Sequence, residues 1–203
     1  MIPAKPVTIV NVGYRSTNYW VVSAGSYRLL VDIGWPGTLG AMKASLKQMG
    51  IPLGEVRYAL ATHYHIDHAG LAEELRREGV PLLILDVQVD AIPFMKTWAK
   101  PDDGYVDIMK VGNIVISLDQ SRQLLRQIGI AGEILHTPGH TAHCVSLLLD
   151  DGSVFTGDLP PATLAFDNSI ALASWGLLRA RGATRVYPGH GPIRAMDGAP
   201  GRE

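Results

Sequence analysis

The chain has 203 residues and a net charge of -1, with 18 Lys plus Arg against 19 Asp plus Glu. This balance disfavours a general binder of nucleic acid, which needs clustered positive charge. Hydrophobic residues make up 47% of the chain and charged residues 18%, which excludes an intrinsically disordered chain. A single cysteine, Cys144, allows no intramolecular disulfide, and the apolar runs are only strand-sized. We therefore expect one cytoplasmic domain over residues 1–203, with no signal peptide and no membrane segment.

Strands and helices alternate along the chain. In order, the pattern predicts a strand at 7–12, a hairpin of 18–24 and 26–33, a helix at 38–49, a strand at 56–61, a helix at 68–78 and a strand at 81–85. A short helix and an irregular loop are expected over 87–105. There follow a strand at 113–117, a helix at 119–128, strands at 132–135, 144–149 and 153–155, a helix at 169–181, a strand at 185–187 and a loose tail at 195–203. This order favours a layered α/β domain with mixed sheets.

All seven histidines fall in three short segments, and each segment follows a predicted strand. In the first, His63 and His65 lie two apart on extended chain, so both rings point to the same side. Asp67 and His68 follow where the next helix begins. Four potential ligands in six residues suit two adjacent ions better than one, and imidazole with carboxylate suits zinc, iron or manganese. The structural alternative is a pair of core histidines with Asp67 capping the helix.

The later segments add single ligand candidates. His140 is presented by a Pro-Gly turn, and His190 lies between two glycines that let the backbone present the ring closely. Asp158 ends a predicted strand in a Gly-Asp step, which taken alone is commonly a turn. His136 and His143 are expected behind the ligands, where they orient the loop by hydrogen bonding.

Together these segments resemble the metallo-β-lactamase superfamily, and in particular glyoxalase II-like hydrolases, without the C-terminal helical extension of the latter. The family's His-x-His-x-Asp-His hallmark is matched by residues 63–68. Its Thr-Pro-Gly-His, Gly-Asp and Pro-Gly-His-Gly steps are matched by His140, Asp158 and His190. Asp32 stands where the family's early strand ends in Asp-Thr-Gly. The resemblance covers nearly the whole chain, and its joint order and strand context make it specific.

The resemblance implies a four-layer αββα sandwich, with two mixed β-sheets face to face, helices outside and the site at one edge between the sheets. It implies two divalent metal ions as cofactors, zinc first, with iron or manganese as alternatives. One ion would be bound by His63, His65 and His140, the other by Asp67, His68 and His190, and Asp158 would bridge both. Asp32 would hold the first histidine segment from behind.

The predicted function is a metal-dependent hydrolase in which hydroxide from a shared water cleaves a small ester, thioester, lactone or phosphodiester. Asp67 is the predicted catalytic residue, because a ligand at that position can also orient the water. Trp35, Trp98 and Tyr14 are predicted to contact the substrate, with ordinary packing as the alternative. The expected partner is a small molecule, with neither nucleic acid nor membrane, and the oligomeric state stays open.

Two other functions are compatible with the same residues. A mononuclear iron persulfide dioxygenase shares much of this signature and would use His63, His140 and Asp158 as iron ligands. A non-catalytic metal-binding or sensing module would keep the fold without the reaction, although its usual sign is missing ligands. Metal identity and number separate the first alternative from a dinuclear hydrolase.

Overall fold

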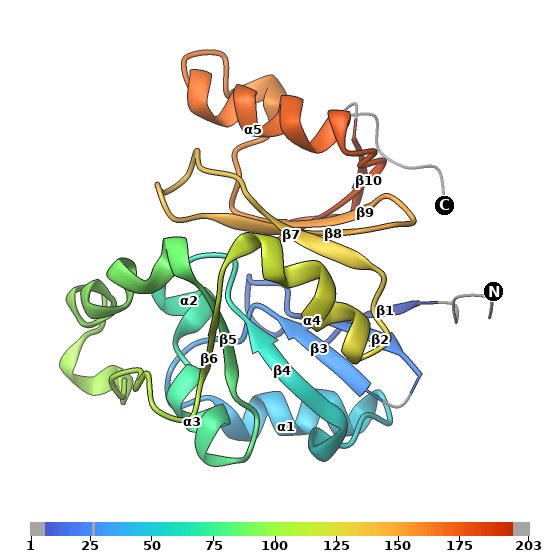
Figure 1. The fold of residues 1–203 in the computed structure, drawn as a ribbon. Coiled ribbons are helices and arrows are strands. Elements are labelled where there is room, and N and C mark those ends of the chain that lie inside the picture. Colours follow the sequence, from blue (N-terminus) through green and yellow to red (C-terminus); the bar gives the residue numbers. More distant parts are fainter. Residues whose placement is uncertain (1–6, 26, 197–203) are drawn as a thin grey trace.

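The first sheet gathers the strands of the N-terminal half of the chain. The computed structural model describes residues 7–25 and 27–196 (Figure 1). The order of strands across this sheet is β1 (Thr8–Asn11), β2 (Trp20–Ala24), β3 (Tyr27–Val31), β4 (Val56–Leu60), β5 (Leu82–Leu85) and β6 (Ile114–Ile116). Antiparallel pairing joins β1, β2 and β3, whereas β3 to β6 pair in parallel. Parallel neighbours need crossover connections. The helix α1 (Leu39–Gln48) connects β3 to β4, α2 (Ile66–Ala69) and α3 (Ala72–Arg77) connect β4 to β5, and 3₁₀ turns connect β5 to β6.

The second sheet is built from the C-terminal half. Its strands lie in the order β11 (Arg194–Ala195), β10 (Arg185–Pro188), β9 (Ser153–Gly157), β8 (Val145–Leu149) and β7 (Gly132–His136). Only β9 and β10 pair in parallel, and α5 (Ser169–Ala180) connects them. The other pairs are antiparallel. Both sheets are therefore mixed, as predicted.

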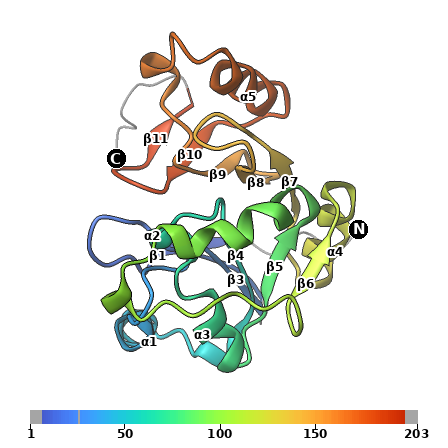
Figure 2. The ribbon, with the colours of Figure 1, turned by 90° about the vertical axis from the view of Figure 1, so that its left-hand side faces the viewer.

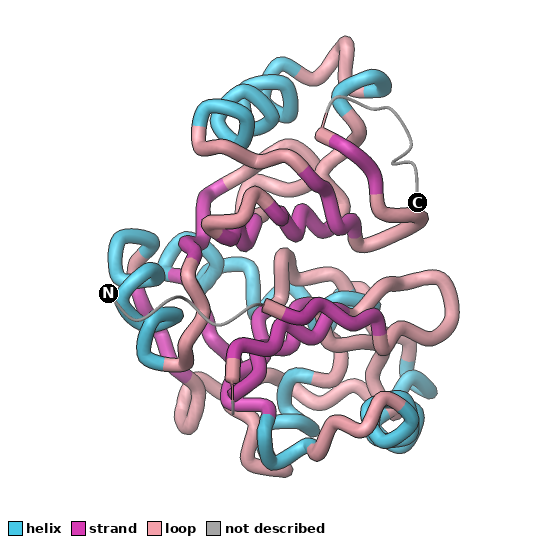
Figure 3. Tube along the Cα trace, turned by 90° about the vertical axis from the view of Figure 1, so that its right-hand side faces the viewer, coloured by secondary structure: helices cyan, strands magenta, loops and turns pink. Residues whose placement is uncertain are grey.

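The two sheets face each other, and apolar side chains fill three layers of contact. One buried cluster packs α1 and α3 onto the outer face of the first sheet, a second lies between the sheets, and a third packs α5 onto the second sheet. Figures 1, 2 and 3 show this sandwich, with α5 above one sheet and α1 and α3 below the other. The predicted αββα fold is confirmed. One helix, α4 (Ser121–Gln127), instead contributes Leu125 to the cluster between the sheets.

The predicted helix at 68–78 is wrong in its bounds, because two helices occupy this region and the first begins at Ile66. The break falls at Gly70, where an added Cβ would lie 2.4 Å from Pro36 Cδ and 2.3 Å from the Ile66 carbonyl oxygen. Leu71 then donates its N–H to the Gly34 carbonyl (3.1 Å) instead of continuing the helix. Because of this break, α2 is a single short turn at one edge of the two-sheet sandwich.

Other differences lie in short segments. The stretch predicted as helix and loop forms 3₁₀ turns, η2 (Asp86–Thr97) and η3 (Pro101–Asp103), and further 3₁₀ turns occur at η1 (Leu53–Glu55), η4 (Leu118–Gln120) and η5 (Ala162–Leu164). The expected loose tail begins instead with β11, and Met196 is buried. The rest of that tail, residues 197–203, lies outside the described residues, as do residues 1–6 and the expected strand start at Ser26. Among the described helices, none has the length and apolar character to cross a bilayer.

Candidate metal centre

Loops from both sheets meet at one edge of the sandwich. The first histidine segment follows β4, the His140 turn lies between β7 and β8, Asp158 follows β9, and His190 follows β10. Backbone hydrogen bonds join these loops: Val145 N–H donates to the Thr62 carbonyl (2.9 Å), and Gly189 N–H donates to the Gly157 carbonyl (2.8 Å). The fold thereby brings all seven predicted ligands to one place.

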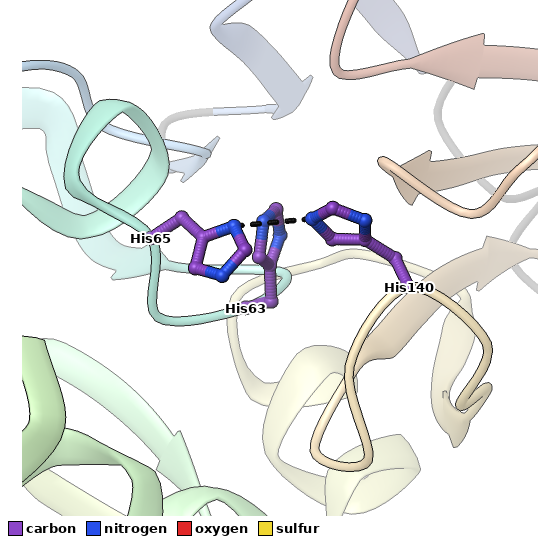
Figure 4. A group of neighbouring side chains, drawn as sticks. All are labelled: His63, His65 and His140. Atoms are coloured by element: carbon purple, nitrogen blue, oxygen red, sulfur yellow. Dashed lines mark hydrogen bonds between the residues drawn. The ribbon is translucent and has the colours of Figure 1, made fainter. Parts of the chain in front are cut away.

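His63, His65 and His140 form the first group of converging side chains (Figure 4). His140 Nε2 lies 3.1 Å from His65 Nδ1, and the His63 ring centroid lies 4.6 Å from that of His65 and 4.8 Å from that of His140. Each residue offers one nitrogen, and the three nitrogens lie within 4.8 Å of one another. Three imidazoles so arranged can hold one divalent ion.

The turn that presents His140 is anchored by α5. Asn168, which caps α5 by accepting the N–H of Ala171, donates its side-chain N–H to the Gly139 carbonyl (2.8 Å). Ser174, one turn further along the helix, donates its hydroxyl to the Pro138 carbonyl (2.6 Å). The helix therefore fixes the position of a ring that lies on a loop.

Asp67, His68 and His190 form the second group, again with ligand atoms within 4.8 Å of one another. Asp67 Oδ2 lies 3.3 Å from His68 Nε2 and 3.2 Å from His190 Nε2. The extended chain that carries His63 and His65 ends where the short helix α2 begins. Asp67 and His68 lie in α2, and the change of chain direction there places them in the second group. One carboxylate and two imidazoles are a ligand set that zinc, iron and manganese accept.

Asp158 lies between the two groups, and its two oxygens face different partners. Oδ2 is 4.0 Å from His63 Nε2 and 3.7 Å from His140 Nε2, both in the first group. Oδ1 is 3.3 Å from His68 Nε2 and 3.5 Å from His190 Nε2, both in the second. A carboxylate placed this way can serve both groups at once.

Three buried atoms at this centre have no hydrogen-bond partner among the described residues: His63 Nε2, His68 Nε2 and Asp158 Oδ1. Buried polar atoms are normally paired, and each one left unpaired costs about 1–3 kcal/mol. All three are atoms of predicted metal ligands, so cations bound at this centre would satisfy them. The residues present thus fit a pair of divalent ions.

Asp32 lies behind His68 and sets its tautomer. Its Oδ2 is 2.9 Å from His68 Nδ1, while Oδ1 accepts hydrogen bonds from the Thr62 N–H (2.8 Å) and hydroxyl (2.9 Å). A carboxylate only accepts, so Nδ1 carries the proton and Nε2 is free to act as a ligand. Asp32 adopts a left-handed φ of 57°, which Asp tolerates better than most residues.

The segment before β2 supports the second group from the other side through residues that were not predicted to take part in the site. The Thr17 hydroxyl donates to Asp67 Oδ2 (2.9 Å), and the Ser16 carbonyl lies 2.8 Å from His190 Nδ1. Thr17 and Asp67 are 50 positions apart in the chain, so no local pattern could indicate their contact.

His136 and His143 are not among the ligand groups found in the described residues. His143 Nε2 accepts the N–H of Tyr64 (3.1 Å), next to the first ligand. His136 Nε2 lies 2.7 Å from the Ala142 carbonyl, within the loop that carries His140. Both rings therefore make hydrogen bonds with the loops beside the centre.

Burial and charge set the protonation of the centre. Burial holds the pKa of His63 well below its ordinary value, and the neighbouring charge of His68 lowers it further. Burial alone would lower the pKa of His68, but the charge of Asp32 and the nearby carboxylate oxygens of Asp158, Asp32 and Asp67 outweigh it and raise that pKa well above the ordinary value. Burial raises the pKa values of Asp67 and Asp158, yet the proximity and charge of His68 outweigh it and lower both. Both carboxyls are therefore ionised near neutral pH.

Gly189 allows the last loop to approach the centre. A Cβ added there would lie 2.6 Å from both Asp158 Oδ1 and His68 Cε1. We expect Gly189→Ala to destabilise the fold by about 1–3 kcal/mol through overpacking and to displace both ligands. Urea unfolding and metal content measure the two effects.

The matched control is Gly176→Ala in α5, where a Cβ meets nothing within 4 Å. Removing a glycine from a helix interior should stabilise the fold by up to about 1 kcal/mol. Equal stability changes in the two variants would contradict the assigned role of Gly189.

A cavity of about 480 Å³ adjoins the first group, and His65 forms part of its lining. Of the three predicted substrate contacts, Trp98 lines this cavity, with its ring centroid 4.8 Å from that of His65. Trp35 and Tyr14 do not line it; both pack against the core under the first sheet, and the Tyr14 hydroxyl lies 2.6 Å from Thr38 Oγ1. Their contact with a substrate stays a prediction that this cavity does not support.

Known proteins are similar to this chain in sequence and in fold. A beta-lactamase-like protein 2 homolog of Caenorhabditis elegans is 29% identical over 188 residues, 88% of this chain and 57% of its own length. A probable metallo-hydrolase of Methanocaldococcus jannaschii is 28% identical over 200 residues, 89% of this chain and 90% of its own length. An atrochrysone carboxyl ACP thioesterase of Claviceps purpurea is 29% identical over 191 residues, 90% of this chain and 53% of its own length. The chain thus spans little more than half of the worm and fungal relatives.

Among solved structures, the BLEG-1 B3 metallo-beta-lactamase superposes with a TM-score of 0.71 at 21% identity, over 95% of each chain. Identity this low supports the shared fold alone. A profile of the metallo-beta-lactamase superfamily matches residues 12–190, which include every residue of both ligand groups. The chain belongs to the metallo-beta-lactamase superfamily.

Proposed function

We propose that the chain is a metal-dependent hydrolase that uses two divalent ions, zinc first, to cleave a small carbonyl substrate such as a thioester, ester or lactone. One observation carries the proposal: Asp158 directs one oxygen to each of two ligand groups. His63, His65 and His140 would hold one ion, and Asp67, His68 and His190 the other. The thioesterase and metallo-hydrolase names of relatives support hydrolysis, and the former favours a thioester over a phosphodiester.

Bound as a pair, such ions supply hydroxide near neutral pH by lowering the pKa of a water. The protein's part is positioning. Asp67, held by the Thr17 hydroxyl, keeps an ionised oxygen at the second group and orients the attacking water. His68 and His190 have their Nδ1 atoms engaged by Asp32 and the Ser16 carbonyl, which leaves Nε2 facing inward. Such fixed ligands need little rearrangement during reaction.

Metal content per chain, determined on protein purified without added metal, tests the proposal together with hydrolysis of thioesters, esters and lactones. About two zinc or similar divalent ions per chain with turnover of one class supports it. One iron per chain with oxygen consumption on persulfides would replace it with the dioxygenase alternative. Stable loading without any turnover would favour a sensing module.

Asp32→Asn tests the supporting contact behind His68. Asparagine keeps the size and tolerates the same φ, but its amide can face His68 Nδ1 as a donor and leave the proton on Nε2. We expect metal affinity at the second group to fall roughly 10–100-fold, the usual effect of losing such a partner. Zinc titration against a competing chelator measures it. Asp150→Asn, at an exposed carboxylate paired with Arg122 (2.8 Å), should leave affinity unchanged, and equal affinity in both variants would refute the role of Asp32.

A further inference from the structure

Apolar side chains form one wall of the cavity beside His65, and none of them belongs to the ligand groups. Val87, Ala91, Phe94 and Trp98 come from η2 and the residue after it, and Ala142 comes from the His140 loop. Phe94 and Trp98 are 64% and 57% exposed, so two large aromatic side chains leave much of their surface uncovered. Surface this apolar at the edge of a reactive centre is typical of a binding site.

The charges on the lining residues determine which chemical groups can bind in the cavity. Among the described residues that line it, Asp90 is the one acidic residue, and none is a lysine or an arginine. The other polar lining residues, such as Thr97 and Thr141, have uncharged side chains. A negatively charged group would meet the Asp90 carboxylate and find no lysine or arginine on the lining. A neutral group meets no such penalty.

The volume of the cavity indicates what kind of ligand it can hold. The cavity measures about 480 Å³, within the range of about 300–1,000 Å³ that is typical of small-molecule sites. Pairs of aromatic rings favour offset or edge-to-face geometry and gain free energy beyond that of burial alone. The Trp98 ring already contacts the His65 ring, with centroids 4.8 Å apart. A flat group resting on Phe94 and Trp98 would therefore adjoin the first ligand group.

We propose that this cavity binds an uncharged aromatic portion of the substrate, and that Phe94 and Trp98 determine specificity for it. This inference rests on the proposed hydrolysis for its catalytic meaning, but binding can be measured without turnover. The aromatic group could belong to the acyl part or to the leaving group, and substrates can separate the two.

The first test is binding to the metal-loaded full chain, followed by NMR of the backbone amides and the tryptophan indoles. The probe is 2-naphthalenemethanol, with 2-naphthalenesulfonate as its anionic counterpart. We expect the neutral probe to shift the Trp98 indole and amides of 87–98, and the sulfonate to need at least about tenfold higher concentration to shift the same signals. Phe94→Ala should weaken the neutral probe about tenfold. Phe166→Ala, at an exposed phenylalanine outside the lining, should not.

Asp90→Asn tests the charge argument separately. It should strengthen sulfonate binding and leave the neutral probe within twofold. Chemical-shift changes confined to other surfaces would overturn the assignment of the cavity. The same conclusion would follow if each probe had equal affinity for the parent chain and for Phe94→Ala.

The second test compares kcat/KM for phenyl acetate, 2-naphthyl acetate and phenyl 2-naphthoate. A preference for 2-naphthyl acetate places the aromatic group on the leaving side, and a preference for phenyl 2-naphthoate places it on the acyl side. Phe94→Ala should reduce either preference about tenfold, whereas Phe166→Ala should keep the parent ratio. Probe binding without hydrolysis of any ester, thioester or lactone would refute the proposed function and keep the cavity. Hydrolysis without preference or probe binding would refute the cavity alone.

Discussion

Asp158→Asn should reduce hydrolysis at least roughly a thousandfold and lower bound metal from about two ions per chain to one or fewer. The carboxylate directs Oδ2 toward His63 and His140, and Oδ1 toward His68 and His190. Asparagine keeps one acceptor oxygen and places an amide donor against a cation or an imidazole nitrogen on the other side. A metal contributes several kcal/mol to catalysis, and about 1.4 kcal/mol corresponds to each tenfold in rate.

Elemental analysis and steady-state kinetics on the same preparation measure both effects. Asp151→Asn is the control. Asp151 lies in the β8–β9 turn, where its side-chain oxygen accepts a hydrogen bond from the Ser153 N–H (2.8 Å). An asparagine side chain can accept the same bond. If Asp158→Asn retains two ions and parental turnover, the bridging role of Asp158 is wrong, whatever the substrate proves to be.

Local sequence predicts most of this centre because the ligands lie on short loops directly after strands. His63 and His65 alternate on extended chain, and His68 stands where α2 turns the chain toward the second group. The layered fold follows from the same pattern, since strands bounded by glycine turns have few ways to bury both faces of two sheets. The pattern alone predicts a layered α/β domain with clustered ligands, whereas the αββα sandwich and the division of the ligands into two groups came from the family resemblance.

Long-range contacts were not accessible. Thr17 meets Asp67, and Ser16 meets His190, through pairings that depend on how the segment before β2 crosses the edge of the second sheet. The break at Gly70 depends on the close approach of Pro36. An aromatic residue near a motif also does not reveal its orientation. Trp98 faces the cavity, whereas Tyr14 packs against Tyr19, with ring centroids 5.0 Å apart.

Removing the metal should lower the melting temperature by about 10 °C, the second large effect that we expect. Without cations, His63 Nε2, His68 Nε2 and Asp158 Oδ1 stay buried without hydrogen-bond partners. A ligand present at about a thousand times its dissociation constant stabilises the folded state by about 4 kcal/mol. In a domain of this size, each kcal/mol shifts the melting temperature by about 2–4 °C.

Calorimetry on chelator-treated protein, before and after zinc is restored, measures the shift. Calcium is the matched control, because it prefers six or more oxygen ligands, whereas this centre offers five imidazoles and two carboxylates. Restored stability with zinc but not calcium ties the effect to the ligand groups. Because Asp158 faces both groups, Asp158→Asn should recover less than half of the parental shift. An unchanged melting temperature on zinc addition, in protein shown to be metal-free, would mean that these side chains do not form a metal centre.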